Sequence, residues 1–176
     1  MSIHIANQIR KLHLGSPSAL SIVDATAGFG GNTLSFMRQF HHVTAIEKDP
    51  EHFQMLKNNL ATYNYVETAA LRLVNADFTH IYREIPGSVY FIDPPWNTGD
   101  EWYTRKKDLM LFLSDVPIYQ IVNQLFSLSA TKLINLKVPY NFDFNLFLKK
   151  VNNMLAINVI PIHTYFLAQI FLTVRE

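Results

Sequence analysis

The chain has 176 residues, of which 49% are hydrophobic and 16% charged, and its formal net charge is +1. This balance is typical of a folded globule, argues against intrinsic disorder, and gives no global electrostatic reason to bind nucleic acid. The absence of cysteine excludes disulfide scaffolds, thiolate metal sites and cysteine nucleophiles.

The N-terminal segment lacks a signal-peptide core, and no apolar run reaches the ~20 residues that a membrane span requires. We therefore expect a soluble intracellular protein, cytoplasmic or nuclear, without membrane contact. We also expect it to be a monomer. The seven histidines are scattered without metal-ligand spacing, so we expect no metal site. Residues 1–20 are expected to form a helical lead-in or a substrate arm, and residues 21–176 a single domain.

A glycine-rich stretch, Asp24–Thr33, follows the buried strand expected at residues 21–23 and precedes a helix with apolar residues at helical spacing. We call it the glycine turn. A strand that turns through glycines into a helix brings bare backbone N–H groups and a positive helix end close to a ligand. Glycine is needed because a side chain would block that approach, and because such turns often require positive φ. Thr33 stands where the dinucleotide fingerprint has its third glycine, so the pattern alone fits either a tight turn or a ligand-binding loop, and the motifs that follow favour the ligand.

The second expected strand, residues 43–47, ends in Glu47, which lies 23 positions after Asp24. An acidic residue about 20 positions beyond a glycine turn is well placed to accept hydrogen bonds from a ribose. Asp49 is expected to cap the next helix, because Pro50 suits the first helical position.

The third expected strand, residues 71–78, carries Asp77 near its end. Asp77 either caps a short turn or contacts a ligand, and its position after two other acidic strand ends favours the ligand. Ligands of open α/β sheets bind outside the carboxyl ends of the strands, where these side chains gather.

The fourth expected strand, residues 88–92, runs into Asp93-Pro94-Pro95-Trp96, which we call the proline corner. Two consecutive prolines neither continue a strand nor enter a helix interior, so they form a stiff, extended corner. An aspartate and an exposed aromatic residue on such a corner are unfavourable for folding alone. This is the most specific functional signal in the sequence.

The remaining segments complete an α/β pattern. Residues 97–116 show no firm periodicity and hold Trp102, Arg105, Lys106 and Lys107, in either a solvated loop or a substrate-gripping one. We expect a helix opening at Pro117, a strand at residues 132–138, a helix at residues 143–151, and strands at residues 156–162 and 167–174. The four residues between the last two strands allow only an antiparallel hairpin.

These motifs together resemble class I S-adenosylmethionine-dependent methyltransferases over nearly the whole chain from about Ser21. Within that class they are most similar to the RNA cap guanine-N2 methyltransferases, the trimethylguanosine synthase group. The resemblance implies a Rossmann-like, mostly parallel seven-stranded sheet with an antiparallel C-terminal hairpin. It also implies S-adenosyl-L-methionine as cofactor, S-adenosyl-L-homocysteine as product, and RNA or capped RNA as partner.

The resemblance further assigns roles to residues. Asp24 and the glycine turn hold the methionine part of the cofactor, Glu47 the ribose and Asp77 the adenine, with Phe78 beside it. Expected cofactor contacts are Asp24, Thr26, Ala27, Gly28, Gly30, Asn32, Thr33, Glu47, Asp77, Phe78 and Asp93. Expected catalytic residues are Asp93, Pro94 and Trp96. Expected substrate contacts are Pro95, Trp96, Asn97, Trp102, Arg105, Lys106 and Lys107.

An exocyclic purine amine is a poor nucleophile because its lone pair is delocalised into the ring. Asp93 and the carbonyl of Pro94 are expected to accept its N–H bonds and stabilise developing positive charge, while Trp96 stacks on the base. We expect an RNA cap guanine-N2 methyltransferase. The open alternatives are an adenine-N6 or ribosomal RNA guanine-N2 methyltransferase, and a catalytically silent subunit that binds RNA or a partner.

Overall fold

The computed structural model describes residues 6–9, 20–96, 109–152, 155–162 and 167–174. The chain divides into two compact units, Met1–Phe91 and Ile92–Glu176, and each is treated by itself below. Seven strands form one sheet in the order β3-β2-β1-β4-β7-β9-β8, and two short strands, β5 and β6, form a separate pair. The expected mostly parallel seven-stranded sheet with an antiparallel C-terminal hairpin is confirmed.

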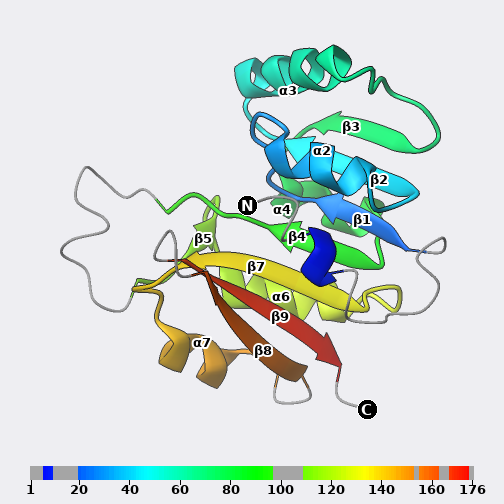
Figure 1. Cartoon of the computed structure of the whole chain (residues 1–176). Helices are drawn as coiled ribbons and strands as arrows, with labels where there is room; N and C mark the ends of the chain where they lie inside the picture. The colour runs from blue at the N-terminus through cyan, green and yellow to red at the C-terminus, as the bar shows by residue number, and fades with distance from the viewer. Residues whose placement is uncertain (1–5, 10–19, 97–108, 153–154, 163–166, 175–176) are drawn as a thin grey trace. The chain divides into compact units, whose positions relative to one another are not determined.

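The first unit is built on parallel strands: β1 (Ser21–Asp24), β2 (His42–Glu47), β3 (Leu71–Asn75) and β4 (Val89–Ile92). Strand β1 pairs with both β2 and β4, and β3 pairs with β2 at the sheet edge (Figure 1). The register aligns Asp24 with Ala45 and Glu47 with Asn75. Asp24 and Glu47, the last residues of β1 and β2, therefore both lie at the carboxyl ends of these parallel strands.

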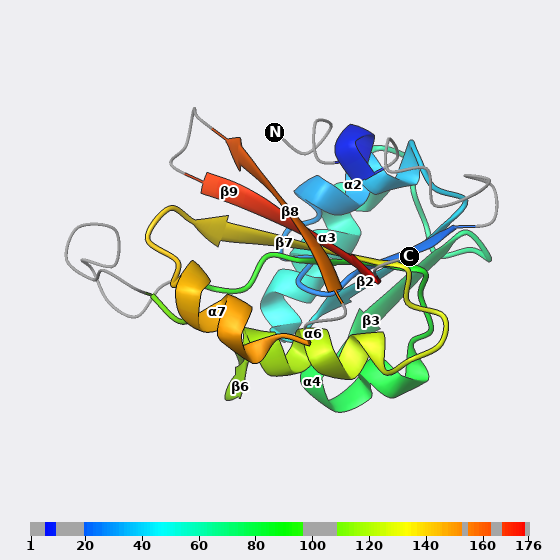
Figure 2. The ribbon, with the colours of Figure 1, turned by 90° about the horizontal axis from the view of Figure 1, so that it is seen from below.

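Helices flank these strands on both faces. Helices α2 (Gly31–Met37) and α3 (Pro50–Thr62) lie on one face, and α4 (Phe78–Ile81) and the short 3-10 helix η2 (Tyr82–Glu84) on the other (Figure 2). The carboxylate of Asp49 accepts the N–H groups of Glu51 and His52, each at 2.9 Å, and Pro50 is the first helical residue. The predicted helix start is confirmed.

The second unit contains an antiparallel set of strands: β7 (Leu133–Pro139), β8 (Leu155–Ile162) and β9 (Leu167–Val174). Strand β9 pairs antiparallel with both of the others, which confirms the predicted hairpin. Helices α6 (Ile118–Phe126) and α7 (Phe144–Lys150) lie together on one face (Figure 2). The apolar face of α6 is buried through Ile118, Ile121, Val122 and Leu125.

Two expectations fail by more than one residue. Strand β3 ends at Asn75 rather than at Phe78, because Asp77 caps α4 and so turns the chain into a helix. The second error lies within residues 97–116, where no regular element was expected. Strands β5 (Phe112–Leu113) and β6 (Val116–Pro117) form a hairpin there. In the lead-in segment, residues 6–9 are helical, and Ile9 is buried as an amphipathic helix requires.

Candidate active site

The glycine turn depends on two positive φ values. Gly28 has φ 53° and Gly30 has φ 90°, a region that other L residues rarely adopt. A Cβ at Gly30 would lie 2.7 Å from Cδ1 of Leu56 on α3, so Gly30 lets α3 pack closely against the turn. A Cβ at Gly28 would meet no atom within 4 Å. The backbone at Gly28 therefore borders open space.

Glu47, at the end of β2, is bonded to the glycine turn. One carboxylate oxygen accepts the N–H of Gly28 at 2.8 Å, and the other accepts the N–H of Asp49 at 2.9 Å. The side chain is nearly buried, with 9% of its surface exposed. A carboxylate has about four acceptor positions, so these two bonds leave capacity for ribose hydroxyls. Glu47 thus holds the glycine turn, and its contact with a ribose stays a prediction.

Asp24, at the end of β1, is fully buried. The hydroxyl of Thr33, in the first turn of α2, donates to its carboxylate at 2.7 Å. This bond closes the glycine turn from one end to the other. Sequence analysis placed both residues in the cofactor site, and the structure brings them together.

Asp77 caps α4, which is one of the two roles left open for it. Its Oδ1 accepts the N–H of Thr79 at 2.9 Å and the Thr79 hydroxyl at 2.7 Å. Phe78 is 2% exposed and its ring packs against those of Tyr82 and Tyr90. Phe78 therefore belongs to the core of the first unit, and its place beside an adenine stays a prediction, as does the adenine contact of Asp77.

The other expected cofactor residues lie along the same turn. Ala27 is buried and its N–H donates to the carbonyl of Ile46 at 2.8 Å, while Thr26 and Asn32 are half-buried. Of the expected substrate contacts, Pro95 is exposed and Trp96 half-buried. Asn97, Trp102, Arg105, Lys106 and Lys107 lie outside the described residues.

The proline corner, described with the second unit, is held by a residue that sequence analysis missed. Lys137 on β7 donates from Nζ to Oδ2 of Asp93 at 2.5 Å. The same Nζ lies over the ring of Trp96, 4.9 Å from its centroid, within the range of a cation–π interaction. One ammonium group therefore contacts both chemically distinctive side chains of the corner.

A signal for Lys137 was present in the sequence. It is the charged residue in the otherwise uncharged run of residues 133–139, and a lysine in a buried strand nearly always has a partner. The identity of that partner was hidden, because Asp93 is 44 positions away.

Burial raises the pKa of the Asp93 carboxyl above its ordinary value, because a charged carboxylate is poorly solvated there. Lys137 acts in the opposite direction, through its charge and its hydrogen bond, without cancelling the effect of burial. The Asp93 side chain keeps 21% of its surface exposed, so it is not sealed from a ligand.

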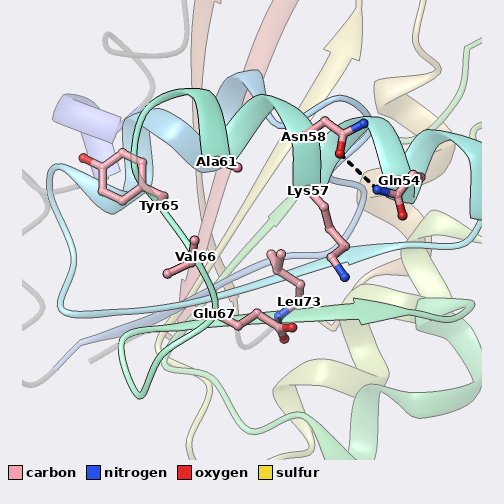
Figure 3. Close-up of a pocket in the computed structure, with 8 residues that line it drawn as sticks. All are labelled: Gln54, Lys57, Asn58, Ala61, Tyr65, Val66, Glu67 and Leu73. Atoms are coloured by element: carbon pink, nitrogen blue, oxygen red, sulfur yellow. Dashed lines mark hydrogen bonds between the residues drawn. The ribbon is translucent and has the colours of Figure 1, made fainter.

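The first unit also has a pocket that is formed by residues other than the expected cofactor contacts. Figure 3 shows its lining from α3, the following segment and β3, with the Gln54 amide donating to Asn58 at 3.0 Å. None of the expected cofactor residues lines it. We assign it no part in the site.

Across the described ranges, no group of three or more His, Asp or Glu side chains is placed to hold a metal ion. In the same part of the chain, every helix is too short or too polar to cross a membrane.

Comparison with known proteins gives both relatives and structural neighbours. An uncharacterized protein of Acanthamoeba polyphaga mimivirus is 28% identical over 134 residues, covering 76% of this chain and 52% of the relative. The trimethylguanosine synthase of Schizosaccharomyces pombe is 31% identical over 90 residues, covering 48% of this chain and 36% of the relative. The chain thus spans about half or less of the length of these relatives.

A solved structure of a putative methyltransferase from Streptococcus mutans, in complex with SAH, superimposes with a TM-score of 0.66. It is 11% identical and the match covers 97% of each chain, so it supports the fold alone. A family model described as RNA cap guanine-N2 methyltransferase matches residues 19–162. The chain has a methyltransferase fold and belongs to the RNA cap guanine-N2 methyltransferase family.

Proposed function

We propose that this protein is an S-adenosylmethionine-dependent methyltransferase that acts on an exocyclic purine amine of RNA, and that the acceptor is N2 of a 7-methylguanosine cap. The alternatives are an adenine-N6 or ribosomal RNA guanine-N2 methyltransferase, and a catalytically silent subunit that binds RNA or a partner protein. The observation that carries the proposal is the proline corner, where a carboxylate and an indole stand three residues apart on a rigid turn.

The acidic residues of the first unit suit the hydrogen-bond donors that S-adenosylmethionine carries. Three carboxylates lie at the carboxyl ends of three neighbouring parallel strands: Asp24 and Glu47 end β1 and β2, and Asp77 lies two positions after β3. S-adenosylmethionine carries an ammonium group, two ribose hydroxyls and an adenine amine, all of which donate to such acceptors. Gly28 adds backbone that borders open space. The SAH-bound neighbour of the same fold is consistent with this assignment.

When bound, the cofactor supplies an activated methyl group on a sulfonium centre. The protein has to hold the acceptor amine in line with that methyl group, and alignment of this kind contributes several kcal/mol, up to about 7–11 in the best cases. In the proposed mechanism, the ionised carboxylate of Asp93 and the carbonyl of Pro94 accept hydrogen bonds from the amine. These bonds localise the nitrogen lone pair and stabilise the positive charge that develops there.

Trp96 would hold the base by stacking, which contributes about 1–3 kcal/mol per base. A 7-methylguanine ring is cationic, and an indole face adds a cation–π term of about 0.5–2 kcal/mol. The family membership favours the cap guanine over the alternatives.

Transfer of a labelled methyl group tests the proposal. Radiolabelled S-adenosylmethionine is supplied with 7-methylguanosine cap analogue, unmethylated cap analogue, and adenine-containing RNA oligonucleotides. We expect methyl incorporation into the 7-methylguanosine analogue, and its loss in Asp93→Ala at saturating cofactor. Incorporation only into adenine oligonucleotides would replace the cap proposal with the adenine one. Binding of cofactor and cap without transfer to any acceptor would favour the silent subunit.

A further inference from the structure

Lys137 connects the two functional side chains of the proline corner. Its Nζ lies 2.5 Å from Oδ2 of Asp93 and 4.9 Å from the centroid of Trp96. The lysine side chain is only 13% exposed, so its position is constrained by its surroundings rather than by solvent. A surface lysine would gain little from either contact, but here both are partly desolvated and correspondingly stronger.

Two described neighbours of Lys137 on its own face of the sheet are uncharged. Gln169 lies directly across from it on β9, and Asn135 lies two residues earlier on β7, and both are fully buried. Neither side chain supplies a second counter-charge. Within the described part of the second unit, the ion pair with Asp93 is therefore what balances this ammonium.

The charge balance has a consequence for the acceptor base. Asp93 alone would present one negative charge to a base stacked on Trp96, which would favour a cationic ring. Lys137 cancels that charge at close range and also takes part of the attraction that the indole offers to cations. Among the described residues, a cationic base and a neutral base thus meet a pair, Asp93 and Lys137, whose charges largely offset each other.

We propose that Lys137 is a positioning and specificity-determining residue: it holds Asp93 in place for the acceptor amine and sets how strongly the corner prefers a cationic base over a neutral one. The inference rests on the proposed function, because it takes Trp96 as the stacking residue. Without the charge of Lys137, the preference for 7-methylguanine over guanine becomes stronger. Without the charge of Asp93, it becomes weaker.

The test measures the affinities of 7-methyl-GTP and GTP by calorimetry in wild type, Lys137→Met, Lys137→Arg and Asp93→Asn. We expect Lys137→Met to raise the affinity ratio of 7-methyl-GTP to GTP by about tenfold. Lys137→Arg keeps the charge and should keep the ratio near the wild-type value. Asp93→Asn removes the carboxylate that pairs with the Lys137 ammonium and should lower the ratio. Lys132→Met, on an exposed lysine five residues earlier, is the matched control.

Opposite shifts in Lys137→Met and Asp93→Asn separate a charge effect from misfolding, which would weaken both ligands together. An unchanged ratio in Lys137→Met, with circular dichroism showing an intact fold, would overturn the inference. Methyl transfer is measured in the same proteins, and Lys137→Met should lower kcat because Asp93 loses its anchor. If wild type transfers no methyl group but the ratios shift as described, the proposed function fails and the role of Lys137 in base selection stands.

Discussion

Glu47 accepts the backbone N–H of Gly28 at 2.8 Å, so the acidic end of β2 holds the glycine turn across 19 positions of sequence. The second carboxylate oxygen accepts the N–H of Asp49, the capping residue of α3. One side chain thus joins the turn, the end of a strand and the start of a helix. Any ligand that bonds Glu47 is coupled to the shape of the turn.

Replacement of Glu47 by alanine should weaken both the cofactor site and the fold. The N–H groups of Gly28 and Asp49 lose their acceptor, and each lost bond, which is part-buried, costs about 1 kcal/mol. We expect a lower free energy of unfolding in urea and a lower affinity for S-adenosylhomocysteine by calorimetry. Glu51→Ala, at an exposed position in the first turn of α3, is the control and should change neither quantity appreciably.

A second prediction separates the two glycines of the turn. Gly30→Ala forces a positive φ on alanine and places its Cβ 2.7 Å from Leu56, so we expect a loss of about 1–3 kcal/mol of folding stability. Gly28→Ala meets open space and carries only the backbone strain, so its loss should be smaller. Denaturant titration of both variants measures the difference. Equal losses would show that the contact with Leu56 relaxes without penalty.

Local patterns predicted much of the fold because they depend on neighbours in sequence. The strand at Leu167–Val174 has the predicted bounds, and the helix after Asp49 starts at Pro50 as expected. The end of β3 was missed because strand propensity extends through Phe78, whereas the cap at Asp77 decides the structure. The four residues of β5 and β6 are too few to produce a periodic signal.

Long-range pairing accounts for what the sequence did not reveal about the site. The carboxylates at the strand ends were identified, but their bonds to Gly28 and Thr33 depend on how the turn closes in three dimensions. Lys137 was read only as a residue of its strand. Its contacts with Asp93 and Trp96 require a strand register that periodicity alone does not supply.

The pH dependence of turnover should report the raised pKa of Asp93. The ionised carboxylate is the hydrogen-bond acceptor, so kcat should fall as the pH drops through its pKa. Burial raises that pKa, so the acid limb should lie above the ordinary aspartate range of about 3.9. Lys137→Met removes the charge and the hydrogen bond that lower the pKa of Asp93, so the acid limb of kcat should move to still higher pH. The pH–rate profiles of both proteins at saturating substrates measure these positions.

The raised pKa of Asp93 also determines how its contribution to folding stability changes with pH. Because its pKa is higher in the folded state than in the unfolded chain, the folded protein binds the proton more tightly. The contribution of Asp93 to folding stability therefore decreases as pH rises from the unfolded pKa to the folded one. An acid limb of wild-type kcat at or below the ordinary aspartate range would contradict the assignment of Asp93 as the acceptor.

Trp96→Leu tests which base the proline corner accepts. Neutral guanine and cationic 7-methylguanine have nearly the same stacking area, so area alone does not discriminate between them. The indole face does, because only the methylated ring carries a full positive charge over it. Leucine keeps much of the apolar surface and removes the ring. Trp96→Leu should therefore lower the affinity for the methylated cap analogue more than for the unmethylated one.

Fluorescence quenching suits the wild-type titration, and calorimetry suits the variant, which lacks the reporting indole. Trp96→Phe is the matched control, since a smaller aromatic face should retain part of the preference. A cation–π term of about 1.4 kcal/mol corresponds to a tenfold difference between the two analogues. An adenine-N6 enzyme has no such preference to lose, and Trp96→Leu would weaken all bases alike. Equal affinities of the wild-type protein for the two analogues would contradict the cap proposal and favour adenine as the acceptor.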